Sequence, residues 1–380
     1  MTIVKFGDVV RETKGKIDRN NNPYEHYVAG DHMDSEDLTI HRRGCFATDD
    51  VGPAFIRKFK RGQVLYGSRR TYLKKVAVAD FDGVTANTTF VLETKDAGVL
   101  MQELLPFIML SEGFTAWSVG KSKGSTNPYV LFSDLADYEF ELPPIALQEK
   151  LSDLLWQIFH LQEKYNRLIK ASDDLVKSQF IAEFSKKPDG SDDYPVLLLK
   201  DSCTIVTGNT PSRSNTDYYG DYIEWIKSDN IIAGESELSH AEESLSELGM
   251  RMGRVVQPGA ILMTCIAGSL NTIGNVAIVD RPVAFNQQIN AIVPHLYDPL
   301  FLYYMLATMR PIIHEATNKT LKCILSKGNL EMIEAIVPPI EQQKRFASFA
   351  AQLDKSKFAA KRALEDLQQT QKALIRKYLG

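Results

Sequence analysis

Three residues early in the chain have the spacing of a metal-dependent nuclease site. Asp82 is followed after ten residues by Glu93, and Lys95 stands two positions later. In such a layout two carboxylates hold a magnesium ion and the lysine assists the attacking water. Asp82 also belongs to "DFDG", which is typical of a turn, and the second half of the chain has no equivalent acidic pair. A surface hairpin therefore explains these residues as well as a nuclease site does.

Two tetrapeptides resemble part of the loop with which an amino-methyltransferase holds a flipped base. That loop needs two successive prolines before its tyrosine, and the cofactor needs a glycine-rich turn between a strand and a helix. The chain has "NNPY" at 21–24 and "TNPY" at 126–129, each without the second proline, and no convincing glycine-rich turn follows a strand. Both tetrapeptides are better interpreted as turns.

Loops rich in cations, amides and hydroxyls have the chemistry that contacts DNA phosphates and base edges. The loop "GKSKGST" (120–126) and its positional counterpart "TNKTLK" (317–322) favour function over a merely solvated loop. For the other clusters, a solvated surface or ordinary turn chemistry is as good an interpretation. The candidate contacts are Arg69, Arg70, Tyr72, Lys121, Lys123, Ser125, Thr126, Thr210, Ser212, Arg213, Lys227, Asn271, Asn318, Lys319, Thr320 and Lys322.

The composition is that of a soluble globular protein. Net charge is −4 with a pI near 6.0, so the chain lacks the bulk positive field that is the usual footprint of nucleic-acid binding. It has no apolar run long enough to span a bilayer and no N-terminal signal segment, so we expect a cytoplasmic location and no membrane contact. The scattered cysteines Cys45, Cys203, Cys265 and Cys323 predict buried small hydrophobes rather than a zinc site or disulfides.

The elements that carry these loops occur twice. "LPPIALQEK" (142–150) returns as "VPPIEQQKR" (337–345), "GQVLYG" (62–67) as "GAILMT" (259–264), and "KVAVAD" (75–80) as "NVAIVD" (275–280). "TANTTF" (85–90) stands where "AFNQQI" (284–289) should be. Because the order is the same in both halves, we interpret the chain as a tandem duplication of a globular domain followed by a helix.

Each globular domain is predicted to be a mixed, mainly β fold of the α+β class. Short runs rich in β-branched residues are bounded by Gly, Asp, Asn and Pro, as in strands. Helices are expected at 100–112 and 298–313, where apolar residues fit a 3.6-residue period. The predicted boundaries are 1–142 and 187–337 for the two domains, and 143–186 and 338–380 for the two helices.

The proline pairs predict the starts of two long helices, because proline is tolerated at a helix entrance but not inside. A heptad seam follows each pair, and antiparallel pairing would relate the two domains by an approximate two-fold axis. The alternative is that each helix packs independently on its own domain. The predicted seam residues are Leu147, Leu151, Leu154, Ile158, Leu161, Tyr165, Leu168, Leu175, Phe346, Phe349, Leu353, Leu367 and Leu374.

Four segments together resemble the specificity subunit of type I restriction-modification enzymes. They are "YVAGDHMDSEDL" (27–38), the two segments that begin with "PPIALQEK" and "PPIEQQKR", and "TGNTPSRSNTDYYGDYIEWIKSDNI" (207–231). The resemblance covers essentially the whole chain in the right order. The family commonly has a glycine pair where this chain has Gly208 and Asn209. The first domain, with "RETKGKIDRNNNPYEHY" (11–27), is also visibly different in type from the second.

The resemblance implies a non-catalytic DNA-recognition subunit. Two target-recognition domains would each read one half of a bipartite, asymmetric double-stranded DNA target, and the helices would set the spacing. The chain would dock two methyltransferase subunits that carry S-adenosylmethionine and would recruit ATP- and Mg²⁺-dependent restriction subunits, with no cofactor or metal of its own. The other classes are a nuclease or methyltransferase acting by itself, and a coiled-coil scaffold, which would leave the two elaborated domains unexplained.

Overall fold

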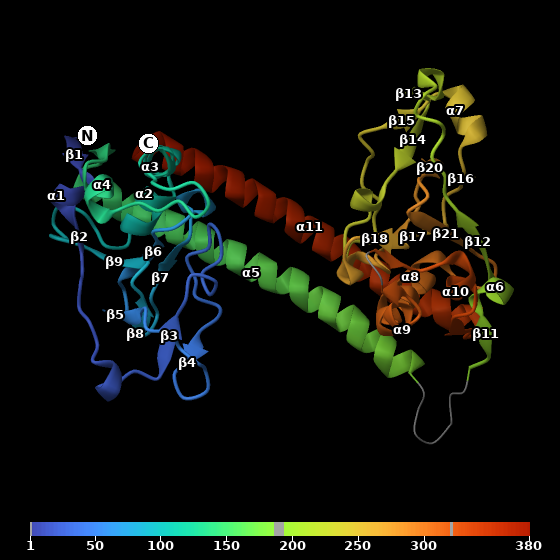
Figure 1. The fold of residues 1–380 in the computed structure, drawn as a ribbon, viewed down its shortest axis with the longest axis horizontal. Helices are drawn as coiled ribbons and strands as arrows, with labels where there is room; N and C mark the ends of the chain where they lie inside the picture. Colours follow the sequence, from blue (N-terminus) through green and yellow to red (C-terminus); the bar gives the residue numbers. More distant parts are fainter. Residues whose placement is uncertain (1, 186–193, 320–321) are drawn as a thin grey trace. The chain divides into compact units, whose positions relative to one another are not determined.

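The computed structural model describes residues 2–185, 194–319 and 322–380. The chain divides into two compact units (Figure 1), Met1–Asn166 with Arg362–Gly380, and Arg167–Lys361. We call them unit 1 and unit 2. Each unit contains one mainly β domain and part of each of two long helices, α5 (Ile145–Phe184) and α11 (Ile340–Leu379). The division therefore cuts both helices.

The two long helices begin where the prolines predict. Helix α5 starts directly after Pro144, and α11 starts directly after Pro339. A prolyl residue has no N–H to give to a helical hydrogen bond, and its fixed φ angle suits a helix entrance. The predicted starts are confirmed. None of the helices in the described ranges has the continuous apolar stretch that a bilayer crossing requires.

A buried glutamine in the first turn holds α5 to the β domain of unit 1. Gln148 is 1% exposed. Its amide nitrogen donates to the carbonyl oxygens of Val99 at 2.9 Å and Pro143 at 2.8 Å, and its amide oxygen accepts from the N–H of Met101 at 3.0 Å. One side chain thus satisfies both the domain and the helix entrance.

Gln343 makes the same set of contacts in unit 2, where it is fully buried. Its amide nitrogen donates to the carbonyl oxygens of Leu296 at 3.1 Å and Pro338 at 2.8 Å, and its amide oxygen accepts from the N–H of Asp298 at 2.9 Å. The sequence repeat that contains the proline pairs is therefore a repeated joint between a domain and its helix.

The β domain of unit 1 has two four-stranded sheets. Within them only the β3–β8 pairing is parallel. The first sheet has the order β2-β9-β6-β7, with strands Val10–Glu12, Thr89–Thr94, Val64–Gly67 and Val76–Val78. The second has the order β4-β3-β8-β5, with strands Gly44–Cys45, His26–Val28, Gly83–Ala86 and Phe55–Phe59. Strands β1 (Thr2–Lys5) and β10 (Glu139–Leu142) pair separately, and the short helices are α1 (Phe6–Val9), α2 (Leu105–Leu110), α3 (Glu112–Gly120) and α4 (Phe132–Ala136).

Unit 2 repeats the first sheet strand for strand and adds an edge strand, β13, to the second sheet, in which β14–β20 is the parallel pair. The first sheet is β12-β21-β17-β19, with strands Cys203–Thr207, Ile289–Pro294, Ile261–Thr264 and Val276–Ile278. The second is β13-β15-β14-β20-β16, with strands Tyr219–Gly220, Ser244–Leu245, Ile223–Ile226, Val283–Phe285 and Val255–Val256. The remaining elements are β11 (Val196–Leu198), β24 (Glu334–Ile336), β18 (Ile266–Ala267), β22 (Asn318–Lys319), β23 (Cys323–Ile324), α6 (Leu199–Ser202), α7 (Glu247–Met252), α8 (Pro299–Thr308), α9 (Arg310–Glu315) and α10 (Lys327–Glu331).

Two predicted helices need correction, and proline is the reason in both. The helix expected at 100–112 starts only at Leu105, because Pro106 occupies its first turn, and a second helix then continues from Glu112 to Gly120. The helix expected at 298–313 divides at Met309 into α8 and α9, since Pro311 cannot continue α8. The mixed, mainly β class of both domains is confirmed.

In each unit the two long helices run antiparallel. Unit 1 packs the beginning of α5, including Leu155 and Phe159, against the end of α11, including Ile375 and Leu379. Unit 2 packs the end of α5, with Phe180 and Phe184, against the beginning of α11 at Phe346. The helices contact one another as well as their own domains, which excludes the alternative of two independent helices.

The predicted seam of α5 is wrong at every second position. Leu154, Leu161, Leu168 and Leu175 were assigned to the seam but are between 40% and 49% exposed. Their neighbours Leu155, Gln162 and Val176 are buried instead. Leucines that recur at every seventh residue suggested the seam, but the buried position is the residue after the leucine. This position can be polar, as at Gln162. The other predicted seam residues are buried (Leu151, Ile158 and Phe346) or half-buried (Leu147, Tyr165, Phe349, Leu353, Leu367 and Leu374).

A lysine is buried in the seam of unit 2. The Lys357 side chain is 9% exposed, and its ammonium group lies 2.8 Å from the carboxylate of Asp173 on α5 and 3.3 Å from that of Asp354. Burial acts to lower the pKa of Lys357, but the hydrogen bond and charge of Asp173, with the charge of Asp354, outweigh it and raise that pKa. A charge in a helical seam is stable only in the register that provides its counter-ions.

We expect Lys357→Met to lower the free energy of unfolding by about 1 to 3 kcal/mol, because it leaves two partly buried carboxylates without a cation. Urea unfolding at neutral pH checks this. Lys355→Met, at an exposed position of the same helix, is the matched control and should change stability little. Equal effects of the two substitutions would show that Lys357 does not fix the register.

Candidate nucleic-acid interface

The two cationic clusters predicted in the first domain lie side by side. Tyr129 forms antiparallel β-bridges with both Arg69 and Lys123. The N–H of Lys123 donates to the carbonyl oxygen of Tyr129 at 2.8 Å, and the N–H of Arg70 donates to that of Pro128 at 2.7 Å. The segment after β6 and the loop after α3 therefore form one surface.

The side chains on this surface are partly neutralised and partly stacked. The Arg69 guanidinium lies 5.9 Å from the centre of the Tyr129 ring, and the Lys121 ammonium lies 4.7 Å from that of Trp117. Lys123 forms an ion pair of 3.0 Å with Asp134, and its hydrogen bond holds the pKa of that carboxyl below its usual value. Of the other predicted contacts here, Arg70, Tyr72, Ser125 and Thr126 are exposed.

A groove of about 720 Å³ in the first domain adds residues that the sequence prediction missed. Lys14, Lys16 and Asn87 line it together with Arg69 and Tyr129. Both lysines belong to the segment 11–27, which sequence reasoning noted only as a difference between the domains. Asn87 stands in the β8–β9 turn, a segment that the sequence analysis used only as evidence of the repeat.

The second domain has the same backbone arrangement with other side chains. Ile324 pairs with both Ile266 and Asn318, as Tyr129 pairs with Arg69 and Lys123. Asn318, Lys319 and Lys322 are exposed, and Thr320 lies outside the described residues. Asn271, in the turn comparable with that of Tyr72, accepts a hydrogen bond from Arg310 on its carbonyl oxygen.

Arg213 and Lys227 form a second cationic group in unit 2. Both pair with Glu243, Arg213 at 2.8 Å and Lys227 at 2.5 Å, and their hydrogen bonds lower the pKa of Glu243. Both cations also lie over the ring of Trp225, at 4.9 Å and 5.5 Å. Trp225 is a buried core residue, and its ring also supports two cations. The group carries one net positive charge.

An amide-rich turn lies beside this group. Gly208 passes so close to the β20–β21 turn that an added Cβ would lie 2.1 Å from the carbonyl oxygen of Asn286, so only glycine fits. Thr210 hydrogen-bonds to Gln287, and Ser212 to Ser214 at 2.8 Å. The turn is equivalent to that of Asn87, and residues 81–90 and 281–290 have the same burial pattern, with Asn87 and Gln287 exposed.

The three residues of the nuclease alternative each have a separate partner. Asp82 accepts a backbone N–H at 2.8 Å, Glu93 forms an ion pair at 2.7 Å, and Lys95 donates to a backbone carbonyl at 2.5 Å. These partners are, in order, Arg61, Arg11 and Gly7. Of the methyltransferase-like tetrapeptides, residues 21–24 form a turn in which the Asn22 side chain accepts the N–H of Tyr24 at 3.0 Å.

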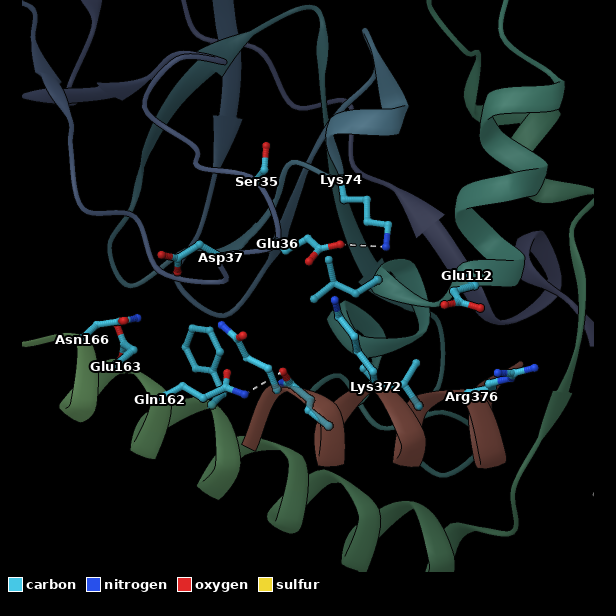
Figure 2. Close-up of a pocket in the computed structure, with 15 residues that line it drawn as sticks. Ser35, Glu36, Asp37, Lys74, Glu112, Gln162, Glu163, Asn166, Lys372 and Arg376 are labelled. Carbon is cyan, nitrogen blue, oxygen red and sulfur yellow. Dashed lines mark hydrogen bonds and ion pairs between the residues drawn. The ribbon is translucent and has the colours of Figure 1, made fainter. Parts of the chain in front are cut away.

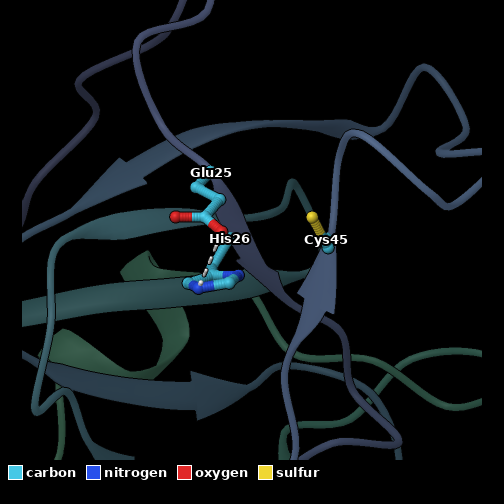
Figure 3. A group of neighbouring side chains, drawn as sticks. All are labelled: Glu25, His26 and Cys45. Carbon is cyan, nitrogen blue, oxygen red and sulfur yellow. Dashed lines mark ion pairs between the residues drawn. The ribbon is translucent and has the colours of Figure 1, made fainter.

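Two groups of side chains have the composition of metal ligands. Figure 3 shows Glu25, His26 and Cys45, whose ligand atoms lie within 4.8 Å of one another. His26 and Cys45 are opposite each other in the β3–β4 pairing, which accounts for their proximity. Structural zinc sites use four ligands, and Glu25 is largely exposed, so this group falls short of one. The second group, Asp37, His41 and Glu163, is held by hydrogen bonds described below.

The cysteines are only partly as predicted. Cys203 and Cys265 are buried, and burial raises the pKa of their thiols to about 11 and about 12. Cys45 and Cys323 are half-buried.

Comparison with known proteins finds similarity to one family. Residues 191–368 match the family model described as "Type I restriction modification DNA specificity domain". The chain is 22% identical to the HindI specificity subunit of Haemophilus influenzae, over 88% of this chain and 89% of that protein. It is 26% identical to the MjaIX specificity subunit of Methanocaldococcus jannaschii, over 47% of this chain and 43% of that protein.

Solved structures show the same fold. The type I S subunit from M. genitalium has a TM-score of 0.61 and 13% identity, covering 99% of this chain and 95% of its own. A chain from a type I R-M system has a TM-score of 0.56 and 18% identity, covering 100% and 97%. The chain is similar to the specificity subunits of type I restriction-modification enzymes over nearly its whole length. These comparisons support a non-catalytic specificity subunit, and they do not support a nuclease or methyltransferase acting by itself.

The second sheet of the second domain contains a half-buried ion pair. Glu224 in β14 pairs with Arg281 at 2.7 Å, and it also accepts from His240 at 2.8 Å and from the N–H of Ala241 at 3.0 Å. The hydrogen bond from Arg281 is the main cause that lowers the pKa of Glu224 to about 2. These contacts position the segment that leads to Glu243.

Since the pKa of Glu224 is lower in the folded state, its contribution is complete above pH 4.5 and is lost as pH falls towards 2. We expect Glu224→Gln to lower the free energy of unfolding at pH 7 by up to about 3 kcal/mol and to flatten its decrease between pH 5 and 3. Urea unfolding across this range measures both effects. The control is Glu247→Gln, at an exposed pair with Arg251. An unchanged pH profile in Glu224→Gln would contradict the assignment.

Proposed function

We propose that this chain reads a bipartite, asymmetric double-stranded DNA sequence for a type I restriction-modification complex, one half-site with each β domain. One observation carries the proposal. The same backbone arrangement occurs in both domains, with an exposed amide turn at Asn87 and Gln287 beside cations and hydroxyls, whereas the side chains differ. A duplicated scaffold with changed polar side chains is what two different half-sites require.

The side chains divide by their chemistry. Arginine and lysine neutralise phosphates and position the protein, whereas asparagine and glutamine can form bidentate hydrogen bonds with adenine. We assign Lys121, Arg69, Arg213 and Lys227 to contacts with DNA phosphates. We assign Asn87 and Gln287 to contacts with base edges. Arg69 and Lys123 in one domain correspond to Ile266 and Asn318 in the other, which supports an asymmetric target.

The long helices set the half-site spacing in this proposal. Each has 40 residues, which corresponds to roughly 60 Å. They also dock two methyltransferase subunits, which carry S-adenosylmethionine, while ATP- and Mg²⁺-dependent restriction subunits join the same complex. Support comes from α5, where the exposed leucines 154, 161, 168 and 175 recur at every seventh residue, as in a face that packs against another helix.

The proposal predicts one footprint with two protected segments and an unprotected middle. The chain is purified with its methyltransferase subunits, sequences are selected from a randomised duplex library, and the selected DNA is footprinted. Binding without sequence preference, or a single continuous protected segment, would exclude two reading domains.

Two variants separate the two kinds of contact in this experiment. Arg213→Ala should weaken binding to all sequences and reduce the slope of log affinity against log salt by about 1. Gln287→Ala should cost about 1 to 3 kcal/mol only on sequences with the preferred second half-site, and leave preference for the first unchanged. Lys355→Gln on α11 is the control.

The exposed leucines give a prediction for the partner. Because a leucine side chain contributes about 1.5 to 3 kcal/mol when fully buried, Leu161→Ser should weaken methyltransferase-subunit binding by about tenfold or more. Isothermal titration with that subunit measures the affinity. Leu248→Ser, at a similarly exposed leucine on α7, is the matched control. Equal affinities of wild type and Leu161→Ser would remove this face from the docking surface.

A further inference from the structure

A loop of unit 1 connects the β domain to α5 well beyond the first turn of that helix. We call residues 34–41 the first brace. The N–H of Val78 at the end of β7 donates to the carbonyl oxygen of Leu38 at 2.8 Å, and Leu38 is buried. One residue later, the Thr39 hydroxyl donates to the Glu163 carboxylate of α5 at 2.9 Å. The brace is thus attached to a strand on one side and to the helix on the other.

Unit 2 has an equivalent loop, residues 232–238, which we call the second brace. The N–H of Ile278 at the end of β19 donates to the carbonyl oxygen of Ser236 at 2.8 Å, and Leu238 is buried. The Glu235 carboxylate receives the Lys361 ammonium of α11, with both oxygens at 2.5 Å. The backbone attachment is the same as in unit 1, but the contact with the helix uses other side chains.

The first brace is itself held rigid. Its Glu36 has a left-handed backbone with φ of 58° and pairs with Lys74 at 2.8 Å, while the N–H of Glu36 donates to the carbonyl oxygen of Lys74 at 3.1 Å. Asp37 pairs with His41 at 2.9 Å and accepts the N–H of Thr39. A non-glycine residue in this region persists only where its surroundings hold it.

A pocket separates the first brace from the helices. Its volume is about 340 Å³, and Figure 2 shows Glu36 and Asp37 on one side facing Glu163, Asn166 and Lys372 on the other. Because this open space lies between the backbone of the first brace and the helices, only a few side chains connect the brace to α5. The Thr39 to Glu163 hydrogen bond is one of them.

Each domain therefore has a near and a far attachment to its helix. The near attachments are Gln148 and Gln343, and the far ones are Glu163 and Lys361. At 1.5 Å per residue the two attachments are roughly 22 Å apart on α5 and roughly 27 Å apart on α11. Two attachments at such a separation fix the angle between a domain and a rod, whereas the near one alone leaves that angle to packing.

We propose that the two braces set the angle at which each recognition domain is held on its own helix, and that Thr39, Glu163, Glu235 and Lys361 thereby restrict the half-site spacing that the protein accepts. The inference rests on the proposed reading of a bipartite DNA target. These four are positioning residues, which act through the orientation of the domains and touch no base.

The test uses the complete complex with its methyltransferase subunits. The DNAs carry the selected half-sites with the selected spacer, or with one base pair more or fewer. Lys361→Glu places two carboxylates together and should reduce the preference for the selected spacer by about tenfold, as should Glu235→Lys, with the half-site sequences unchanged. The double exchange of Glu235→Lys with Lys361→Glu should restore the preference, because it re-forms the pair.

Further variants guard against a general loss of structure. Lys361→Gln and Thr39→Val each remove one contact without adding a like charge and should reduce the preference by a smaller factor. Lys355→Glu is the matched control on α11. A general destabilisation would lower binding to all spacers equally and would not be restored by the double exchange, and that result overturns the inference.

The outcomes also separate this inference from the proposed function. Suppose that the wild-type complex protects two half-sites and prefers one spacer, and that the Lys361→Glu and Glu235→Lys variants prefer this spacer equally. This result would overturn only the role of the braces. A wild-type complex without any bipartite preference would overturn the proposed function and the braces with it. Reduced preference in both single variants and its return in the double variant supports the proposal.

Discussion

The first turn of each long helix has to leave a β domain and remain attached to it, and in both halves a buried glutamine does this. Gln148 and Gln343 each make three hydrogen bonds through the side-chain amide. Two of them go to the loop before the helices of the domain, and the third goes to the prolyl carbonyl before the long helix. An unsatisfied buried amide would be costly, so each glutamine specifies one geometry of the joint. The prolines beside it forbid an earlier start, and together they determine where the helical part of each half begins.

The duplication preserves this joint and the sheet order but not the polar surface. The backbone pairings of Tyr129 in one domain and of Ile324 in the other are equivalent. The side chains at the paired positions differ in charge and size. The brace loops show the same division, with an identical backbone attachment and a hydroxyl in one half where the other has a carboxylate. Backbone contacts that both halves share therefore maintain the same fold, whereas the side chains on it differ between the halves.

The sequence predicted the features that depend on neighbouring residues. Proline pairs located both helix starts, and the repeat predicted a mixed, mainly β domain before each of them. Prediction of the α5 seam was wrong at Leu154, Leu161, Leu168 and Leu175, because heptad counting cannot tell a leucine that packs within the chain from one that faces outwards. The same method also passed over the buried Lys357, whose partner Asp173 is on the other helix.

For the interface, the sequence identified the loops but not their assembly. Lys121 and Arg69 are far apart in the chain, and only the pairing of Tyr129 with Arg69 and Lys123 shows that their loops meet. Asn87 and Gln287 were missed because a turn between two strands has no periodicity to mark it. Their shared exposure in an otherwise buried pattern marks them only once the structure is known.

Charge pairing limits the net positive charge of the surfaces that we propose contact DNA. Glu243 already neutralises part of the charge of Arg213 and Lys227, and Asp134 does the same for Lys123. A phosphate that approaches must therefore compete with a carboxylate, which weakens the sequence-independent attraction that dominates most DNA binding. In the proposed function, base contacts then account for a larger share of the affinity, and other subunits supply the remaining charge neutralisation. For a subunit whose task is to discriminate between sequences, low non-specific affinity is an advantage, because it reduces the time spent on the many sites that do not match.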